Sequence, residues 1–199
     1  MIIVDAEQGS ESWFKEKLGK PSASNASKII TNDGKPSKQA DGYMYELAAE
    51  IITGKQEETY KNGYMEMGNE REEESRKLFE ITHDIEVTKV GVVYKDKEKK
   101  FLCSPDGLVK SEYGLELKNV LGKTQVKRLL DGDVPSEYFS QIQMSLYITG
   151  FQFWMFQSYT PGMRPLVLKV ERDEKFIKAL AVEIEVFNRQ LSEITERIK

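Results

Sequence analysis

The sequence has one cysteine and one histidine in 199 residues, and each scarcity excludes a class of chemistry. Cys103 alone cannot form an internal disulfide or a multi-cysteine metal site. His83 alone cannot supply the several imidazoles of a histidine-based zinc hydrolase, and its polar Thr-His-Asp context is typical of an exposed turn. Any chemistry must therefore come from carboxylates, lysines and hydroxyls. Carboxylate and water ligands suit hard cations such as Mg²⁺ or Mn²⁺.

Long apolar runs and an excess of basic residues are lacking as well. No stretch approaches the ~20 apolar residues that a membrane-spanning helix needs, so we expect a soluble, intracellular protein without a membrane partner. The net charge is −4 and the pI about 5.3, unlike proteins that coat nucleic acid non-specifically. A confined basic channel inside an acidic exterior is still compatible with these values, because net charge does not report where charges lie.

The spacing of apolar and turn residues predicts one domain with helices at both ends and strands in the middle. This order of elements predicts an α/β (α+β) fold, with a central mixed β-sheet flanked by helices. We expect one domain over 1–199, in which helices within 10–53 pack on a core of 65–199. Helices are expected over 10–18, 22–30, 65–81, 124–130, 135–147 and 174–198, and a further helix follows the loop at 32–37 and ends at Gly54. Strands are expected over 87–94, 101–109, 114–120, 151–159 and 166–170.

A single aspartate interrupts an otherwise apolar stretch at Ser104-Pro105-Asp106-Gly107. Proline, aspartate and glycine form turns, so an ordinary turn is one interpretation. Apolar residues precede the segment at 101–103 and follow it at 108–109. An aspartate buried there without a partner would be costly, and a bound cation would remove that cost. Asp106 is therefore a candidate metal ligand.

Gly114-Leu115-Glu116-Leu117-Lys118 has the alternation of a strand. Because side chains of a strand point to opposite faces in turn, Leu115 and Leu117 should face the core while Glu116 and Lys118 share the other face. The alternative is a half-exposed strand with two solvated charges.

A third candidate segment is the acidic run Gly68-Asn69-Glu70-Arg71-Glu72-Glu73-Glu74. A charge run on a helix usually marks a solvated face, and composition does not select which acid matters.

Taken together, the three segments indicate a hydrolytic site. If the strands around 106 and 116 pair as a hairpin about the turn at 110–113, Asp106 and Glu116 converge with Lys118 beside them. Two converging carboxylates repel each other unless a divalent cation lies between them. A neighbouring lysine can hold a water and stabilise developing negative charge. Such a set suits metal-assisted hydrolysis of a phosphodiester.

The ordered motifs resemble a known family. Ser-Pro-Asp-Gly followed by Glu-Leu-Lys resembles the core motif of the PD-(D/E)xK nuclease superfamily, whose core is restriction-endonuclease-like. The wider set resembles phage recombination exonucleases of the lambda-exonuclease (YqaJ-like) type. This set comprises Trp13-x-x-x-Lys17-Leu18-Gly19-x-x-Ser22-Ala23-Ser24, Gly68-x-x-x-Glu72, Leu78-Phe79-Glu80, Cys103 to Leu108, Gly114 to Lys118 and Gln141-x-Gln143.

The resemblance implies roles for individual residues. It selects Glu72 from the acidic run, makes Asp106 and Glu116 metal ligands, and makes Lys118 the catalytic lysine. The main-chain carbonyl of Leu117 would be a further ligand, and Glu72 would act directly or through water. Lys17, Ser24, Gln141 and Gln143 would bind the DNA and its 5′ phosphate, with Tyr147 extending the Gln141-x-Gln143 pattern. Lys17 stands where close relatives have arginine, and it gives a point charge in place of a bidentate fork.

The resemblance also implies an activity and partners. The expected enzyme is a metal-dependent deoxyribonuclease with two Mg²⁺ ions per site, replaceable by Mn²⁺. It would digest one strand of linear double-stranded DNA from 5′ to 3′, leaving 3′ single strands for recombination. We expect a homotrimeric ring, a phage single-strand annealing protein as partner, and a place in the cytoplasm of a bacterial host of a phage or prophage. A PD-(D/E)xK endonuclease and a catalytically silent DNA-end-binding protein are the alternatives.

Overall fold

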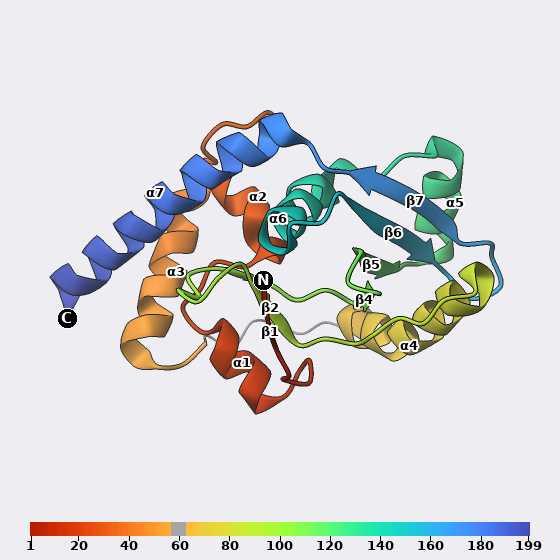
Figure 1. Cartoon of the computed structure of the whole chain (residues 1–199), viewed down its shortest axis with the longest axis horizontal. Helices are drawn as coiled ribbons and strands as arrows, with labels where there is room; N and C mark the ends of the chain where they lie inside the picture. The colour runs from red at the N-terminus through yellow and green to blue at the C-terminus, as the bar shows by residue number, and fades with distance from the viewer. Residues whose placement is uncertain (57–62) are drawn as a thin grey trace.

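The computed structural model describes residues 1–56 and 63–199, with side chains described outside 57–70 (Figure 1). The predicted α/β class is confirmed. The helices are α1 (Glu11–Lys17), α2 (Ala26–Ile29), α3 (Ala40–Thr53), α4 (Gly63–His83), α5 (Gly122–Asp131), α6 (Phe139–Thr149) and α7 (Glu174–Ile198), with 3₁₀ turns η1 (Ala23–Asn25) and η2 (Ser136–Tyr138). The strands are β1 (Ile2–Val4), β2 (Val92–Tyr94), β3 (Leu102–Cys103), β4 (Gly107–Val109), β5 (Tyr113–Asn119), β6 (Phe153–Tyr159) and β7 (Leu166–Glu171).

The strands form two sheets where the sequence suggested one. A small antiparallel sheet has the order β1-β2-β3, and a larger sheet has the order β4-β5-β6-β7. In the larger sheet β5 and β6 run parallel and the other pairs are antiparallel, so this sheet is mixed as predicted. The strand β1 was not predicted from the sequence, and it pairs through Ile3 with Val93.

The strand predicted over 101–109 is two strands, and this is the main correction to the expected fold. β3 belongs to the small sheet and β4 to the large one, so the chain changes sheets at Ser104-Pro105-Asp106. Proline has no N–H to continue a ladder, which suits a break at Pro105. The strand expected over 87–94 is shorter as well, because this segment also passes from one sheet to the other. Thr88 makes a single bridge to Leu108 of the large sheet, and β2 of the small sheet begins only at Val92.

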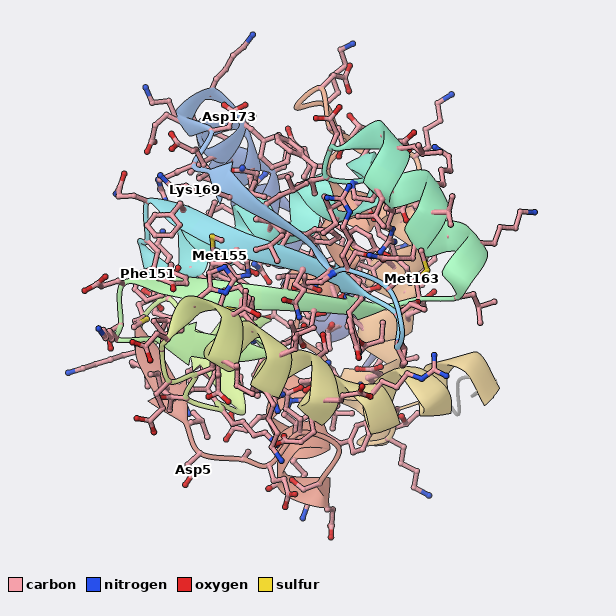
Figure 2. All side chains as sticks on the ribbon, turned by 90° about the vertical axis from the view of Figure 1, so that its right-hand side faces the viewer. Asp5, Phe151, Met155, Met163, Lys169 and Asp173 are labelled. Carbon is pink, nitrogen blue, oxygen red and sulfur yellow. The ribbon has the colours of Figure 1, made fainter. Side chains whose placement is uncertain are left out.

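Helices α4 and α6 cover opposite faces of the large sheet. Phe79 of α4 packs against Leu115 and Leu117, while Ile142 and Leu146 of α6 pack against the other face. In Figure 2, α4 crosses the view in front of the large sheet. The labelled residues Met155 of β6 and Lys169 of β7 lie opposite each other in this sheet. Gly114 allows close packing inside the sheet, because a Cβ there would lie 2.1 Å from the Trp154 ring.

A second core joins the N-terminal helices to the C-terminal one. The long helix α7 runs alongside α3 (Figure 1), and Phe187 and Leu191 of α7 share a buried cluster with Met44 and Leu47 of α3. The predicted helix ends at Gly54 and Gly150 are confirmed, since both glycines adopt left-handed C-cap conformations. No helix among residues 1–56 and 63–199 is both long and apolar enough to cross a membrane.

Candidate active site

The β4–β5 hairpin fixes Asp106 beside β5. Leu108 pairs with Gly114, and the hairpin turns at 110–112, one residue less than the turn predicted over 110–113. The Asp106 N–H donates to the Leu115 carbonyl at 3.2 Å, and the Leu117 N–H donates to Asp106 Oδ2 at 2.6 Å. Asp106 thus extends the hydrogen bonding between β4 and β5 by one residue, first through its main-chain N–H and then through its carboxylate. An ordinary solvated turn does not account for this geometry.

Glu116 is buried on the face of β5 that packs against α6. Its residue is 3% exposed, which excludes the half-exposed strand with solvated charges. Two groups compensate this burial at the same oxygen. Gln141 Nε2 of α6 donates to Glu116 Oε1 at 2.6 Å, and Lys118 Nζ forms an ion pair with that oxygen. Lys118 Nζ also lies 5.1 Å from the centre of the Tyr138 ring.

The charges of this site influence one another strongly. Burial, and then the nearby Glu116 and Glu72 carboxylates, raise the pKa of Asp106 to about 8. Burial lowers the pKa of Lys118, but Glu116 and Asp106 outweigh that effect and leave it above its ordinary value. The hairpin therefore concentrates negative charge that one lysine only partly balances. A bound cation would relieve this repulsion.

Helix α4 brings Glu72 to the same place. Glu72 and Asp106 both line a cavity, and the Glu72 carboxylate contributes to the raised pKa of Asp106. Glu72 is ion-paired with the buried Arg76 one turn later. Of the neighbouring acids, Glu73 meets Lys89 at 2.6 Å, and Glu74 accepts a hydrogen bond from Tyr159 at 2.5 Å. Glu72 and Glu73 share Arg76 and the cavity, Glu73 has Lys89 as a further partner, and Glu74 points to Tyr159 instead, a distinction that composition could not make.

The cavity of about 980 Å³ links these acids to the N-terminal helices. Lys17 lies in its wall, with Nζ 3.8 Å from the centre of the Trp13 ring. Burial lowers the pKa of Lys17 to about 8, and Glu50 partly opposes this shift. The cavity lining includes Trp13, Lys17, Ser22, Asn25, Glu72 and Asp106.

The residues expected at the DNA end do not all gather here. Ser24 is exposed in η1, and its hydroxyl lies 3.0 Å from that of the cavity residue Ser22. Gln141 reaches the site through Glu116. Gln143 requires a correction. It is 0% exposed, donates to the Glu171 carbonyl at 2.8 Å and accepts from the Asp173 N–H at 2.9 Å, so its side chain fastens α6 to the start of α7 and cannot touch DNA in this conformation.

Tyr147 does not extend the Gln141 pattern either. Its hydroxyl lies 2.5 Å from Lys95 Nζ and its ring stacks on Phe101, so the side chain packs between the two hydrophobic clusters on either side of α6.

Sequence reasoning missed three groups that shape the site. Arg76 was overlooked because it follows a charge run. Trp13 was noted only as part of a motif, yet its Nε1–H donates to Ser104 Oγ at 2.7 Å, two residues before Asp106. Gln8 donates to the Pro105 carbonyl at 2.8 Å. The last two contacts span more than 90 residues, and no local sequence pattern reports them.

The donor set fits a hard divalent cation. The partly exposed Asp106 and the buried Glu116 offer carboxylate oxygens in a negatively charged place, the chemistry that Mg²⁺ and Mn²⁺ prefer. No group of three or more His, Cys, Asp or Glu side chains with metal-binding geometry occurs in the described part of the chain. Main-chain oxygen, water or a phosphate would therefore complete the shell, as is common for Mg²⁺.

Comparison with known proteins identifies the family. The YqaJ-like viral recombinase domain matches residues 12–152. The chain belongs to this family. The alkaline exonuclease LHK-Exo of Laribacter hongkongensis superposes with a TM-score of 0.86 at 30% identity, over 95% of this chain and 96% of that one. The same exonuclease in complex with dAMP gives a TM-score of 0.86 at 30% identity, over 96% of both chains.

A more distant structure shares the fold. A phage-related exonuclease of Haemophilus somnus 129PT has a TM-score of 0.68 at 16% identity, over 90% of this chain and 96% of that one. Comparison with curated proteins gives no match. The resemblance to lambda-exonuclease-type enzymes and the restriction-endonuclease-like core are thus confirmed.

Proposed function

We propose that this protein is a metal-dependent exonuclease that digests one strand of linear double-stranded DNA from 5′ to 3′ and releases mononucleotides. Family membership and the likeness to LHK-Exo support a DNA exonuclease. The observation that carries the proposal is the meeting of the buried Glu116 with the partly exposed Asp106 and Lys118 at the β4–β5 hairpin. A protein that only bound DNA would not need two carboxylates that repel each other beside the cavity.

Asp106 and Glu116 would hold the cation, with the Leu117 carbonyl as a main-chain ligand and Glu72 acting through water. When bound, one or two Mg²⁺ or Mn²⁺ ions would supply a Lewis acid and lower the pKa of an attacking water. Lys118 would hold that water and stabilise negative charge on the phosphate. Gln141 would keep Glu116 oriented, because its amide bonds the same carboxylate oxygen that Lys118 approaches.

Lys17 would bind the 5′ phosphate of the strand being digested, with Ser24 and Gln141 nearby. The shared cavity supports this role, since Lys17 lies in the same wall as Glu72 and Asp106. A cation held there would draw the new 5′ phosphate forward after each cleavage. Gln143 is not part of this proposal because of its burial.

The enzyme would act as a homotrimeric ring that encloses DNA, in the cytoplasm of a bacterium carrying a phage or prophage. Its 3′ single strands would serve a phage annealing protein in homologous recombination. Helix α5 offers positions at which to test assembly, since it turns Arg128 inward and leaves Val126 and Leu130 47% and 81% exposed. Sedimentation should give a trimer at micromolar concentration; a monomer that still digests processively would contradict the ring.

The deciding experiment compares linear and covalently closed circular duplex DNA with Mg²⁺. We expect loss of the linear DNA alone, 5′-labelled mononucleotide appearing first, and no activity after EDTA. Nicked circles would indicate an endonuclease, and binding to ends without digestion would indicate a silent end-binding protein. Release of label from 3′ ends before 5′ ends would contradict the polarity.

A further inference from the structure

Arg76 is a buried arginine at the contact between α4 and the β4–β5 hairpin. Its side chain is 5% exposed, although it stands in an exposed, charged stretch of the helix. A guanidinium always carries its charge in proteins, and burial of a charge is costly unless it is paired and hydrogen-bonded. All three nitrogens of this guanidinium have partners, and two of these partners belong to the candidate active site.

The three partners come from two different elements. Nη2 pairs with the Glu72 carboxylate, Nη1 lies 2.6 Å from Glu73 Oε2, and Nε donates to the main-chain carbonyl of Asp106 at 3.1 Å. One planar group thus connects the Glu72 carboxylate on α4 with the main chain of Asp106, just before β4. Arginine is suited to this because its donors form a rigid fork, which a lysine does not provide.

The two carboxylates depend on Arg76 to different extents. Glu73 has two more cations within ion-pair distance, Lys89 and Lys77. Glu72 has no cation within that distance other than Arg76 in the part of the chain with described side chains. Loss of the guanidinium would therefore leave Glu73 paired, whereas Glu72 would face Asp106 without compensation.

Other contacts already dock α4 on the sheet. Gln157 of β6 donates to the carbonyl and the hydroxyl oxygen of the buried Ser75, at 2.7 and 2.9 Å. Phe79 is fully buried against Leu115 and Leu117. The helix would keep its place without Arg76, so docking does not explain why a charge is buried there.

We propose that Arg76 is a positioning residue that holds Glu72 toward the main chain of Asp106, so that the two carboxylates serve one cation. This role rests on the metal-dependent function proposed above, and it concerns the affinity for the cation and the rate of the chemical step. Residues that orient metal-binding groups without touching the metal commonly change metal affinity or activity by about 10–100-fold. Arg76 acts here through Glu72 and through the position of Asp106.

The test measures binding of Mn²⁺ alone by calorimetry, together with kcat and KM on linear duplex DNA, for Arg76→Gln, Arg76→Lys and Glu73→Gln. Arg76→Gln should weaken Mn²⁺ binding and lower kcat by about 10–100-fold, with KM for DNA within about threefold. Arg76→Lys should fall between it and the unsubstituted protein, because it retains the charge and loses the fork. Glu73→Gln removes the other carboxylate from the same guanidinium and should stay within about threefold on every measure.

A double-mutant cycle separates positioning from general stability. If Arg76 acts through Glu72, adding Arg76→Gln to Glu72→Ala should change Mn²⁺ affinity by less than about threefold further. Equal losses in both backgrounds, or unchanged Mn²⁺ affinity in a folded Arg76→Gln protein, would overturn the role while leaving the metal-dependent function in place. An unsubstituted protein that bound no Mn²⁺ would overturn both. Thermal unfolding of each variant verifies that the fold is retained.

Discussion

Gln141 and Glu116 are joined side chain to side chain across the packing of α6 on β5, with 2.6 Å between the amide nitrogen and the carboxylate oxygen. The same carboxylate oxygen is paired with Lys118. Two residues further along the helix, Gln143 is fully buried and bonded to main-chain groups near α7. Residues two apart on a helix do not share a face, which explains why similar side chains have different surroundings.

These two glutamines should therefore respond differently to alanine. Gln141→Ala should lower kcat by about 10–100-fold with the melting temperature nearly unchanged, because Glu116 loses an orienting partner. Gln143→Ala should lose about 1–3 kcal/mol of stability, because buried polar groups lose their partners, and should retain most activity. Calorimetric unfolding and steady-state digestion of linear duplex check both. The reverse pattern would mean that Gln143 is the functional glutamine.

Asp106, Glu116 and Lys118 should behave as one unit. Alanine at any of them should reduce turnover by several orders of magnitude while DNA binding persists, because groups that act together are not additive in their effects. Single-turnover digestion and an equilibrium binding assay measure the two properties. Near-normal turnover in any folded variant would remove that residue from the chemistry.

The acidic helix offers an internal comparison. Glu72→Ala should be severely impaired, since Glu72 lies in the cavity wall near Asp106. Glu73→Ala and Glu74→Ala should retain most activity, because the Glu73 carboxylate pairs with Lys89, Lys77 and Arg76 and the Glu74 carboxylate accepts a hydrogen bond from Tyr159. Initial rates on one substrate suffice. Equal losses across the three positions would show that the helix does not present Glu72 selectively.

The response of Lys17 to pH gives a further prediction. Its folded pKa is lowered from 10.5 to about 8, so it becomes neutral as pH rises through 8. The preference for 5′-phosphorylated over 5′-hydroxyl ends should then fall above about pH 8, because a neutral lysine no longer attracts the phosphate. The ratio of kcat/KM for the two ends is the right measure, since kcat/KM reports the ionisation of the free enzyme.

Two variants of Lys17 make that measurement specific. Lys17→Ala should lose most of the preference at pH 7, by an amount corresponding to about 1–3 kcal/mol, the scale of a hydrogen bond to a charged group. Lys17→Arg should keep the preference up to pH 10, because arginine remains charged. A preference in the unsubstituted enzyme that is constant from pH 7 to 10 would contradict the proposed phosphate contact.

Much of this site could be predicted from the sequence, because its strongest signals are local. The alternation Leu115-Glu116-Leu117-Lys118 predicted which residues share a face, and the turn residues after Val109 predicted the hairpin that brings Asp106 to β5. Family likeness selected Glu72, which the charge run alone could not do.

The parts that were missed depend on contacts between distant residues. The break between the two sheets at Pro105 looked like a turn inside one strand, since residues 101–103 and 107–109 are apolar on both sides of it. The hydrogen bond from Trp13 to Ser104 joins segments 91 residues apart. The different surroundings of Gln141 and Gln143 could have been predicted from helix geometry, but the family pattern treated the pair as equivalent.

The change of sheets at Ser104-Pro105-Asp106 has a consequence for labelling the enzyme. We expect one added residue in this joint to shift β3 or β4 out of register with its neighbour, and so to disturb the hydrogen bond between Asp106 and the Leu117 N–H. The turn at 95–100 joins β2 to β3 within one sheet, and its residue Lys97 is exposed. A fluorophore attached at position 97, or a short peptide tag inserted there, should therefore leave digestion intact. Single labelled molecules could then be followed along DNA.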